Sequence, residues 1–309
     1  MTEAPQHTTR QRVGRPALSR AAEPVVRHLI RLAGWSAIAI LAAIAAYLFS
    51  GALRAIEEVG MVAMVTGEFW YPTSNNPQFG FVPSEAGSAW VTAVALLLSV
   101  PLGVATAVYI SEFASGRVKD VSKSIIEFMA AIPSVVLGLI GIALLVQNIR
   151  TWFGLDTGLT SLAAGIMVGV LALPTIVSIS EDALHAVPME LRHGSLALGN
   201  TRWQTTYKVV VPAASSGIFA AIMLGLGRAI GETMVVLMLS GNAGTIPASP
   251  FEPARTLPGT IAGELGEVVR GGLHYSSLFA MGLVLFVVTF AINLAADIVL
   301  ERQRRRWRR

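Results

Sequence analysis

The sequence contains no cysteine. A disulfide framework, a thiol nucleophile and a cysteine-based metal site are therefore excluded, and the sequence gives no information on the redox compartment. Charged residues are also scarce: they make up 14% of the 309 residues, while apolar residues make up 53%. A soluble chain of this length needs more charged surface, so this composition, with a mean hydropathy of +0.62, indicates an integral membrane protein.

Motifs for several kinds of chemistry are absent as well. No Gly-Lys dipeptide occurs, so the chain has no Walker A loop and no ATP site of that type. It has neither the H-E-x-x-H of zinc proteases nor the G-x-S-x-G turn of hydrolases. Its five histidines do not show metal-ligand spacing on one helix face. We therefore predict no catalytic residue, no metal site and no cofactor bound by this chain, and an intramembrane enzyme would need a constellation that the sequence lacks.

Apolar segments long enough to cross a membrane dominate what is present. A spanning helix needs about 20 mostly apolar residues, and these runs are too long and too uniformly apolar for barrel strands. Six segments qualify, namely 30–53, 88–112, 124–148, 159–180, 213–240 and 277–300. The sequence therefore predicts an all-α integral membrane protein with six transmembrane helices.

Lysine and arginine are distributed unevenly between the two sides of this predicted topology. The net charge of +4 does not require nucleic acid as a partner, because the basic residues gather at the two ends and in short connections. Eighteen of the 23 fall on one side and four on the other, which predicts cytosolic N- and C-termini and an even number of spans. We expect a disordered basic cytosolic tail over 1–24, a membrane domain over 25–300 and a second basic cytosolic tail over 301–309.

The two longest connections on the outer side are 54–87 and 241–276. The first carries Trp70 and Tyr71 followed by "PTSNNP", and the second carries four prolines and a predicted short helix around "GTIAGELGEVV". One interpretation is that the aromatic rings sit at the membrane interface and the prolines shape ordinary loops. The other is that the loops form a docking surface for an external partner, since long loops without a role are uncommon.

The predicted cytosolic connection between spans four and five contains residues that are typical of helix starts and helix ends. Pro188 suits the first turn of a helix, and Gly199 suits the left-handed position that ends one. Thr201 and Gln204 have the spacing of a capping box, and Pro212 suits the start of the fifth span. This pattern predicts a helix, a tight turn and a second short helix.

Two interpretations of residues 181–212 remain open. An amphipathic helix could lie on the lipid surface, with Arg192 and Arg202 at the headgroups. Two helices separated by a tight turn would instead form a firm protrusion, which is what a cytosolic partner needs in order to push on the membrane helices.

Arg228 and Glu232 lie near the centre of the fifth predicted span. Insertion scales make a central arginine unfavourable by about 2.5–3.5 kcal/mol, so it should face a partner or a water-filled cavity. A spacing of four residues predicts that both side chains lie on one helix face. They could form a simple pair that neutralises itself, although two leucines would serve as well. The alternative is that Arg228 offers a translocated anion a bidentate guanidinium, with Glu232 balancing its charge.

Small residues recur along the same span, at Gly217, Ala221, Gly225 and Ala229. Such a stripe lets helix backbones approach closely, and it predicts a static helix pair while remaining compatible with gating.

Proline occurs inside three predicted spans, at Pro101, Pro133 and Pro174. Each frees a backbone carbonyl and favours a kink. The neighbouring hydroxyl residues, which could satisfy such groups or line a path, are Ser134, Thr175 and Ser178.

The cytosolic connection resembles the EAA loop of ABC importer permeases, in which E-A-A is followed by a glycine and then by I-x-L-P. His193, Gly194 and Ser195 occupy the E-A-A positions, so the triplet itself is lost, and with it any salt bridge that the family makes from the glutamate. The remaining positions of the motif, with their spacing kept, are Gly199, Val209, Val211 and Pro212.

A wider resemblance covers most of residues 79–242, to the permeases of the phosphate-specific transport (Pst) systems. The similar segments, in order, are "FGFVP", "VPLGVATAVYISEFA", "IEFMAAIPSVVLGLIG", "LALPTIVSISEDALHAVP", "LRHGSLALGNTRWQTTYKVVVPAA" and "GLGRAIGETMVVLMLSGN". "GRAIGETM" followed by "LMLSGN", and the later "GGLHYSSLFAMGLVLFVVTF", are more similar to the C-type than to the A-type permease subunit. An A-type subunit, or a permease for another oxyanion, is the alternative.

This resemblance implies a MetI-like fold, that of a type I ABC importer permease in the bacterial inner membrane. It implies as partners a second, A-type permease subunit, a cytosolic ATPase dimer that carries the ATP site, and an external phosphate-binding protein. The residues expected to line the substrate path are Arg228, Glu232, Thr233 and Ser134. Those expected to couple to the ATPase are Glu190, Leu191, His193, Gly194, Ser195, Gly199, Trp203 and Pro212.

Overall fold

The computed structural model describes residues 17–307, with side chains from 24 to 301. The chain divides into two compact units, Met1–Tyr47 and Leu48–Arg309. The described part of the first unit is the beginning of helix α1, which covers Ala17–Glu58. From Pro24 onward, α1 is long and apolar enough to cross a membrane, with a mean hydropathy of 2.1.

Both predicted tails contain helix. Residues 1–16 and 308–309 lie outside the described residues. However, α1 already begins at Ala17, and the last helix, α14 (Leu273–Trp307), continues past the predicted boundary at 301. Helix therefore extends beyond both predicted boundaries, at 24 and 301, because the alanine, leucine, arginine and glutamine residues there are good helix formers.

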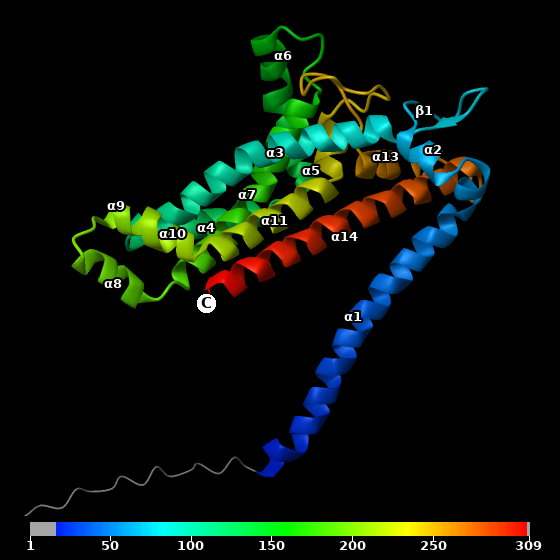
Figure 1. Ribbon diagram of the computed structural model, residues 1–309. Coiled ribbons are helices and arrows are strands. Elements are labelled where there is room, and N and C mark those ends of the chain that lie inside the picture. Colours follow the sequence, from blue (N-terminus) through cyan, green and yellow to red (C-terminus); the bar gives the residue numbers. More distant parts are fainter. Residues whose placement is uncertain (1–16, 308–309) are drawn as a thin grey trace, which may run out of the picture. The chain divides into compact units, whose positions relative to one another are not determined.

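The centre of the second unit consists of long helices that pack along one another (Figure 1). Helix α7 is the most buried of the candidate spans; α3 packs along it, and α11 contacts α3, α7 and α14. The bounds are Val82–Val108 for α3, Ser161–His185 for α7 and Ser215–Gly231 for α11.

The number of spans agrees with the predicted six when two helices joined by a bend are counted together as one span. Among the described residues, five helices are long and apolar enough to cross a membrane. A sixth span arises from Arg202–Ala213 and Ser215–Gly231, which pass the same test together but are bent by 68°. Within the fifth predicted span, 213–240, α11 ends at Gly231 and the next helix begins at Met234, so that span is not one straight helix.

The third predicted span, 124–148, begins too early. Its first part belongs to a separate amphipathic helix, α4, and the apolar span begins after Pro133. Pro101 and Pro174 lie inside the continuous helices α3 and α7, so only Pro133 marks a break. The bounds of the elements in this region are Arg117–Ala131 for α4, Ser134–Ile140 for α5, Gly141–Val146 for the π-helical turn η2 and Gln147–Phe153 for α6.

The small-residue stripe of α11 packs against α7, as a static helix pair requires. A Cβ added at Gly217 would lie 2.3 Å from Cβ of Ala183, and one added at Gly225 would lie 2.7 Å from Cγ1 of Ile176. Ala221 and Ala229 are buried. The close approach of the two helices therefore depends on the absence of side chains at the glycines.

Gly217→Ala should destabilise the protein, although alanine favours helix by up to about 1 kcal/mol. The added methyl group collides with Ala183, and overpacking of this kind costs about 1–3 kcal/mol. Gly227→Ala is the matched control, because only Oδ1 of Asn293, at 3.9 Å, lies near a Cβ there. Thermal unfolding in detergent should show a lower midpoint for Gly217→Ala alone; equal midpoints would show that this interface is loose.

The segments predicted to face the two sides of the membrane lie at opposite ends of the second unit (Figure 1). The loop elements α2, β1, β2 and α13 gather at one end, and α8, α9 and α10 lie at the other. Strands β1 and β2 form a short antiparallel hairpin across "PTSNNP". The bounds are Met61–Thr66 for α2, Trp70–Tyr71 for β1, Gln78–Phe79 for β2 and Leu257–Glu264 for α13; they are Met189–Ala197 for α8, Arg202–Thr205 for α9 and Val211–Ala213 for α10.

Single cysteines placed at these ends should react from opposite sides of the membrane. Thr245 and Leu198 are both exposed, and the cysteine-free chain gives a clean background for labelling. We expect a membrane-impermeant maleimide added to intact cells to label Thr245→Cys but not Leu198→Cys. The reverse pattern would overturn the orientation derived from the charge distribution.

Candidate functional site

Arg228 and Glu232 lie at a break in the fifth span rather than on one helix. Helix α11 ends at Gly231, and Glu232 has extended backbone angles, φ −67° and ψ 126°. The short helix α12 (Met234–Leu239) follows after Thr233. The prediction that both charges share one helix face is therefore wrong, because the spacing of four residues places them together only on a continuous helix.

The two charged side chains do not pair with each other in the described part of the chain. Nη1 of Arg228 donates to Oγ1 of Thr175 in α7 at 3.2 Å, and the arginine is otherwise exposed. Oε1 of Glu232 accepts from the backbone N–H of Val235 at 3.5 Å, in the first turn of α12. The self-neutralising pair is thus not formed, and most N–H donors of the guanidinium are open to a ligand.

The break also makes both charges less costly. Arg228 lies in the last turn of α11, where a cation interacts favourably with the helix dipole. Glu232 precedes the first turn of α12, where an anion does. Each such interaction is worth about 0.3–1 kcal/mol at exposed positions. These local effects help to hold the charges in the span, but they leave the exposure of the guanidinium unexplained.

A second helix break lies next to the first. Ile132 and Pro133 separate α4 from α5, and Ile132 has φ −66° and ψ 125°, close to the angles of Glu232. The helices that follow the two breaks, α5 and α12, contact each other, with Gly138 against Met238. Ser134 is the first residue of α5, and Thr233 lies just before α12. Both residues are therefore at the starts of two helices that contact each other.

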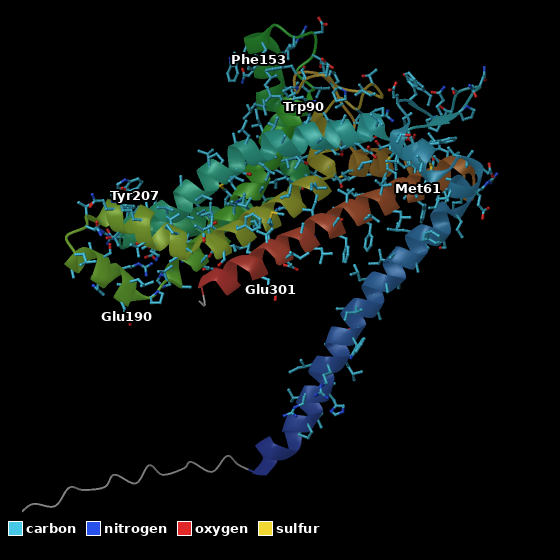
Figure 2. All side chains as sticks on the ribbon, viewed as in Figure 1. Met61, Trp90, Phe153, Glu190, Tyr207 and Glu301 are labelled. Atoms are coloured by element: carbon cyan, nitrogen blue, oxygen red, sulfur yellow. The ribbon has the colours of Figure 1, made fainter. Side chains whose placement is uncertain are left out.

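The connection between spans four and five forms the predicted helix, turn and helix. Gly199, at φ +85°, ends α8: its N–H donates to the carbonyl of Leu196 at 2.9 Å, and the N–H of Asn200 donates to that of Ser195 at 3.3 Å. Thr201 and the residue three positions later form the predicted capping box at α9. Figure 2 shows Glu190 and Tyr207 at this end of the second unit. We call α8 and α9 with the turn between them the protrusion.

The protrusion is attached to the membrane helices by arginine side chains. Nη2 of Arg192 donates to Oε1 of Glu112 at 2.9 Å and to the carbonyl of Leu184 at 2.8 Å, and its Nη1 donates to the carbonyl of Val187. Nη2 of Arg202 donates to the carbonyl of Glu112 at 2.7 Å. Both arginines therefore bind within the chain, as a firm protrusion requires, and Arg202 also stays exposed.

Most of the residues predicted to couple to an ATPase lie on the outer surface of the protrusion. Leu191 and Trp203 are 46% and 60% exposed, and Leu198, which was not predicted, is 87% exposed. Ser195 is buried and bonds Oγ1 of Thr205 at 2.9 Å, so it joins α8 to α9 and offers no surface to a partner. The other exposed residues of the predicted set are Glu190, His193, Gly194 and Gly199, and Pro212 is half-buried in α10.

The sequence analysis did not predict the contacts of three further charged residues, Lys119, Lys123 and Glu181. Nζ of Lys123 lies 2.9 Å from the buried Glu181, and Nζ of Lys119 lies 3.4 Å from it. The hydrogen bond to Glu181 raises the pKa of Lys123. The only available signal was periodicity: positions 119 and 123 share a helix face.

The loops predicted to lie on the outer side are held together around Glu264. This carboxylate accepts from Nε1 of Trp70 at 3.0 Å and from Nη1 of Arg255 at 2.8 Å, and it lies 2.8 Å from Nε2 of His274. Trp70 is buried, so it does not anchor the loop at a membrane interface, whereas Tyr71 is exposed. A cavity of about 610 Å³ opens beside this cluster.

These features define a class of protein: a membrane permease with breaks in neighbouring spans, a charged site at one break and a helical protrusion at one end. The chain belongs to the family of binding-protein-dependent transport system inner membrane components, which matches residues 99–309. It is a protein of the inner membrane, as that family description states, and its candidate spans make it a multi-pass one.

Relatives extend this match over most of the chain. The sequence is 40% identical over 249 residues to the probable ABC transporter permease protein YqgH of Bacillus subtilis, covering 81% of each chain. It is 34% identical over 291 residues to the phosphate transport system permease protein PstC of Mesorhizobium japonicum, covering 88% of each.

Solved structures show the same fold. A chain of a bacterial alginate ABC transporter, in complex with a periplasmic protein that binds an alginate pentasaccharide, matches with a TM-score of 0.61 and 19% identity, covering 92% of this chain and 98% of that one. The inward-facing MetNI methionine transporter matches with a TM-score of 0.55 and 21% identity, covering 71% and 93%. These likenesses confirm the predicted MetI-like fold of an ABC importer permease.

Proposed function

We propose that the chain is the C-type permease subunit of an ATP-driven importer of inorganic phosphate. The observation that carries this proposal is the exposed guanidinium of Arg228 at a helix break, in a chain that is 34% identical over 88% of its length to a phosphate permease. Guanidinium groups bind phosphate with paired, charge-assisted hydrogen bonds. A cation within a membrane span is also costly unless it serves a ligand or a partner.

The substrate path in this proposal runs past the two breaks. Arg228 offers hydrogen bonds to the anion, and Ser134 and Thr233, at the starts of the helices beyond the breaks, line the same region. Glu232 keeps the anion from binding too tightly, and its carboxylate accepts a hydrogen bond from a protonated phosphate oxygen. Sulfate is fully ionised at neutral pH and offers no such proton. An A-type subunit, or a permease for another oxyanion, is the alternative.

The energy for transport comes from a partner in this proposal. The chain binds no cofactor itself, and ATP acts through a cytosolic ATPase dimer. The exposed apolar residues of the protrusion, such as Leu198 and Trp203, seat in a groove of that ATPase. A second, A-type permease completes the path through the membrane. The outer loops, held together by Glu264, provide the docking surface for an external phosphate-binding protein.

Co-purification and uptake test this function together. The tagged chain should bring down a second permease and an ATPase, and membrane vesicles containing the complex should take up labelled phosphate only when ATP is supplied. A chain that purifies alone, with phosphate uptake unchanged after its deletion, would contradict the proposal.

A further inference from the structure

We propose that Glu112 is the positioning residue through which movement of the protrusion reaches the membrane helices. The inference rests on the proposed function, because it concerns how the work of an ATPase enters this chain. Glu112 lies in the π-helical turn η1 (Tyr109–Phe113), which continues α3 at the end where the protrusion lies. π-Helical turns occur frequently at functional positions.

Glu112 binds both halves of the protrusion. Its carboxylate accepts from Arg192 of α8 at 2.9 Å, and its carbonyl accepts from Arg202, the first residue of α9, at 2.7 Å. The neighbouring Phe113 adds a ring contact to Trp203, with centroids 5.9 Å apart. One short turn at the end of α3 therefore holds α8 and α9 at once.

Arg192 carries the same connection to a second span. Besides Glu112 it binds the carbonyls of Leu184 and Val187, at and just beyond the end of α7. The guanidinium thus joins α8 to the ends of α3 and α7, which are packed along each other. A displacement of α8 must move these two helices or break the arginine contacts.

The burial of this pair makes breaking it costly. The side chains of Arg192 and Glu112 are 13% and 12% exposed, so water and salt screen their attraction only weakly. Separating them would leave both charges poorly solvated. The glutamate that the E-A-A triplet would supply is replaced by the exposed His193. The internal bond between Arg192 and Glu112 is therefore the ion pair that ties α8 to the membrane helices.

Distance measurements on the assembled complex test this role without reference to the substrate. Spin labels on cysteines at Leu97 in α3 and Ala197 in α8 report their separation, since both residues are exposed, neither is among the residues proposed to seat in the ATPase, and the chain has no other cysteine. In the wild type we expect an ATP analogue to change this distance by less than about 2 Å, because both elements move together. In Glu112→Gln the distribution should shift or broaden.

Transport provides the second readout. Glu112→Gln should hydrolyse ATP at near wild-type rate but import at least about fivefold less phosphate per ATP. Asp120→Asn is the matched control, because it removes an exposed carboxylate from α4 on the same side, and it should leave both readouts unchanged. Should Glu112→Gln fail to assemble, Glu112→Asp, with its shorter reach, is measured in the same way.

An unchanged distance distribution in the variant would overturn the proposal. A parallel fall in hydrolysis and import, with their ratio preserved, would also overturn it, since it would reduce Glu112 to a structural anchor. A wild-type complex that hydrolyses ATP without importing phosphate would instead contradict the proposed substrate, and the distances would still decide the role of Glu112.

Discussion

We expect Arg228→Leu to abolish phosphate uptake while the complex still assembles. The guanidinium is exposed at the break between α11 and α12, and its one bond to a side chain in the described part of the protein is to Thr175. Leucine is as favourable as arginine for helix, and more favourable in a membrane, so folding should not suffer. Losing charge-assisted hydrogen bonds of about 1.5–3 kcal/mol each lowers the transport rate roughly a hundredfold or more.

Uptake of labelled phosphate in membrane vesicles, with assembly verified by co-purification, measures this effect. Glu232→Gln serves as the graded comparison, because an amide keeps an acceptor oxygen but loses the charge, and it should impair uptake less than Arg228→Leu. Near-normal transport by Arg228→Leu would reduce the arginine to a residue that only stabilises the end of α11.

Gly199→Val should uncouple ATP hydrolysis from uptake or weaken binding of the ATPase. Gly199 has a φ of +85°, and a β-branched residue in this left-handed region is strained by about 1–2 kcal/mol. No atom lies within 4 Å of a Cβ built at this glycine, so the effect comes from the backbone and not from a clash. The turn between α8 and α9 therefore changes shape, and with it the surface offered by Leu198 and Trp203.

Gly34→Val is the matched control for this substitution. Gly34 lies inside α1, a Cβ there also meets nothing within 4 Å, its backbone has no positive φ, and it is outside the residues proposed to couple to the ATPase. Membrane insertion, ATPase association and phosphate imported per ATP should be compared in both variants. If Gly199→Val assembles and transports like Gly34→Val, the turn has no role in coupling.

The apolar runs were enough to predict the spans but not their breaks. Hydropathy averaged over a span-length window cannot separate the amphipathic α4 from the apolar helix after Pro133. The three prolines gave identical signals, and only tertiary packing, which holds α3 and α7 continuous through Pro101 and Pro174, distinguishes them. At Glu232 the chain has no proline, and a preceding glycine is too common in this sequence to mark a break.

The candidate site, like the spans, was predictable from the sequence only where the signal comes from one residue or a few neighbouring residues. Arg228 was identified by the unfavourable free energy of placing an arginine in the membrane, which is a property of one residue. Its partner Thr175 lies 53 positions away, and the partner of Glu112 lies 80 positions away. Pairs of this kind depend on how α3, α7, α8 and α11 pack. The turn at Gly199 and the capping box at Thr201 are local, and they were predicted correctly from a few neighbouring residues.

ATP-driven uptake in proteoliposomes tests the phosphate-importer assignment most directly. The vesicles would hold this chain, the second permease and the ATPase, with ATP on the ATPase side and the phosphate-loaded binding protein on the other. Labelled phosphate should accumulate only with ATP, excess sulfate should not compete, and Arg228→Leu should remove the signal. Accumulation no greater than in ATP-free vesicles, or equal competition by sulfate, would contradict the assignment of this chain to phosphate import.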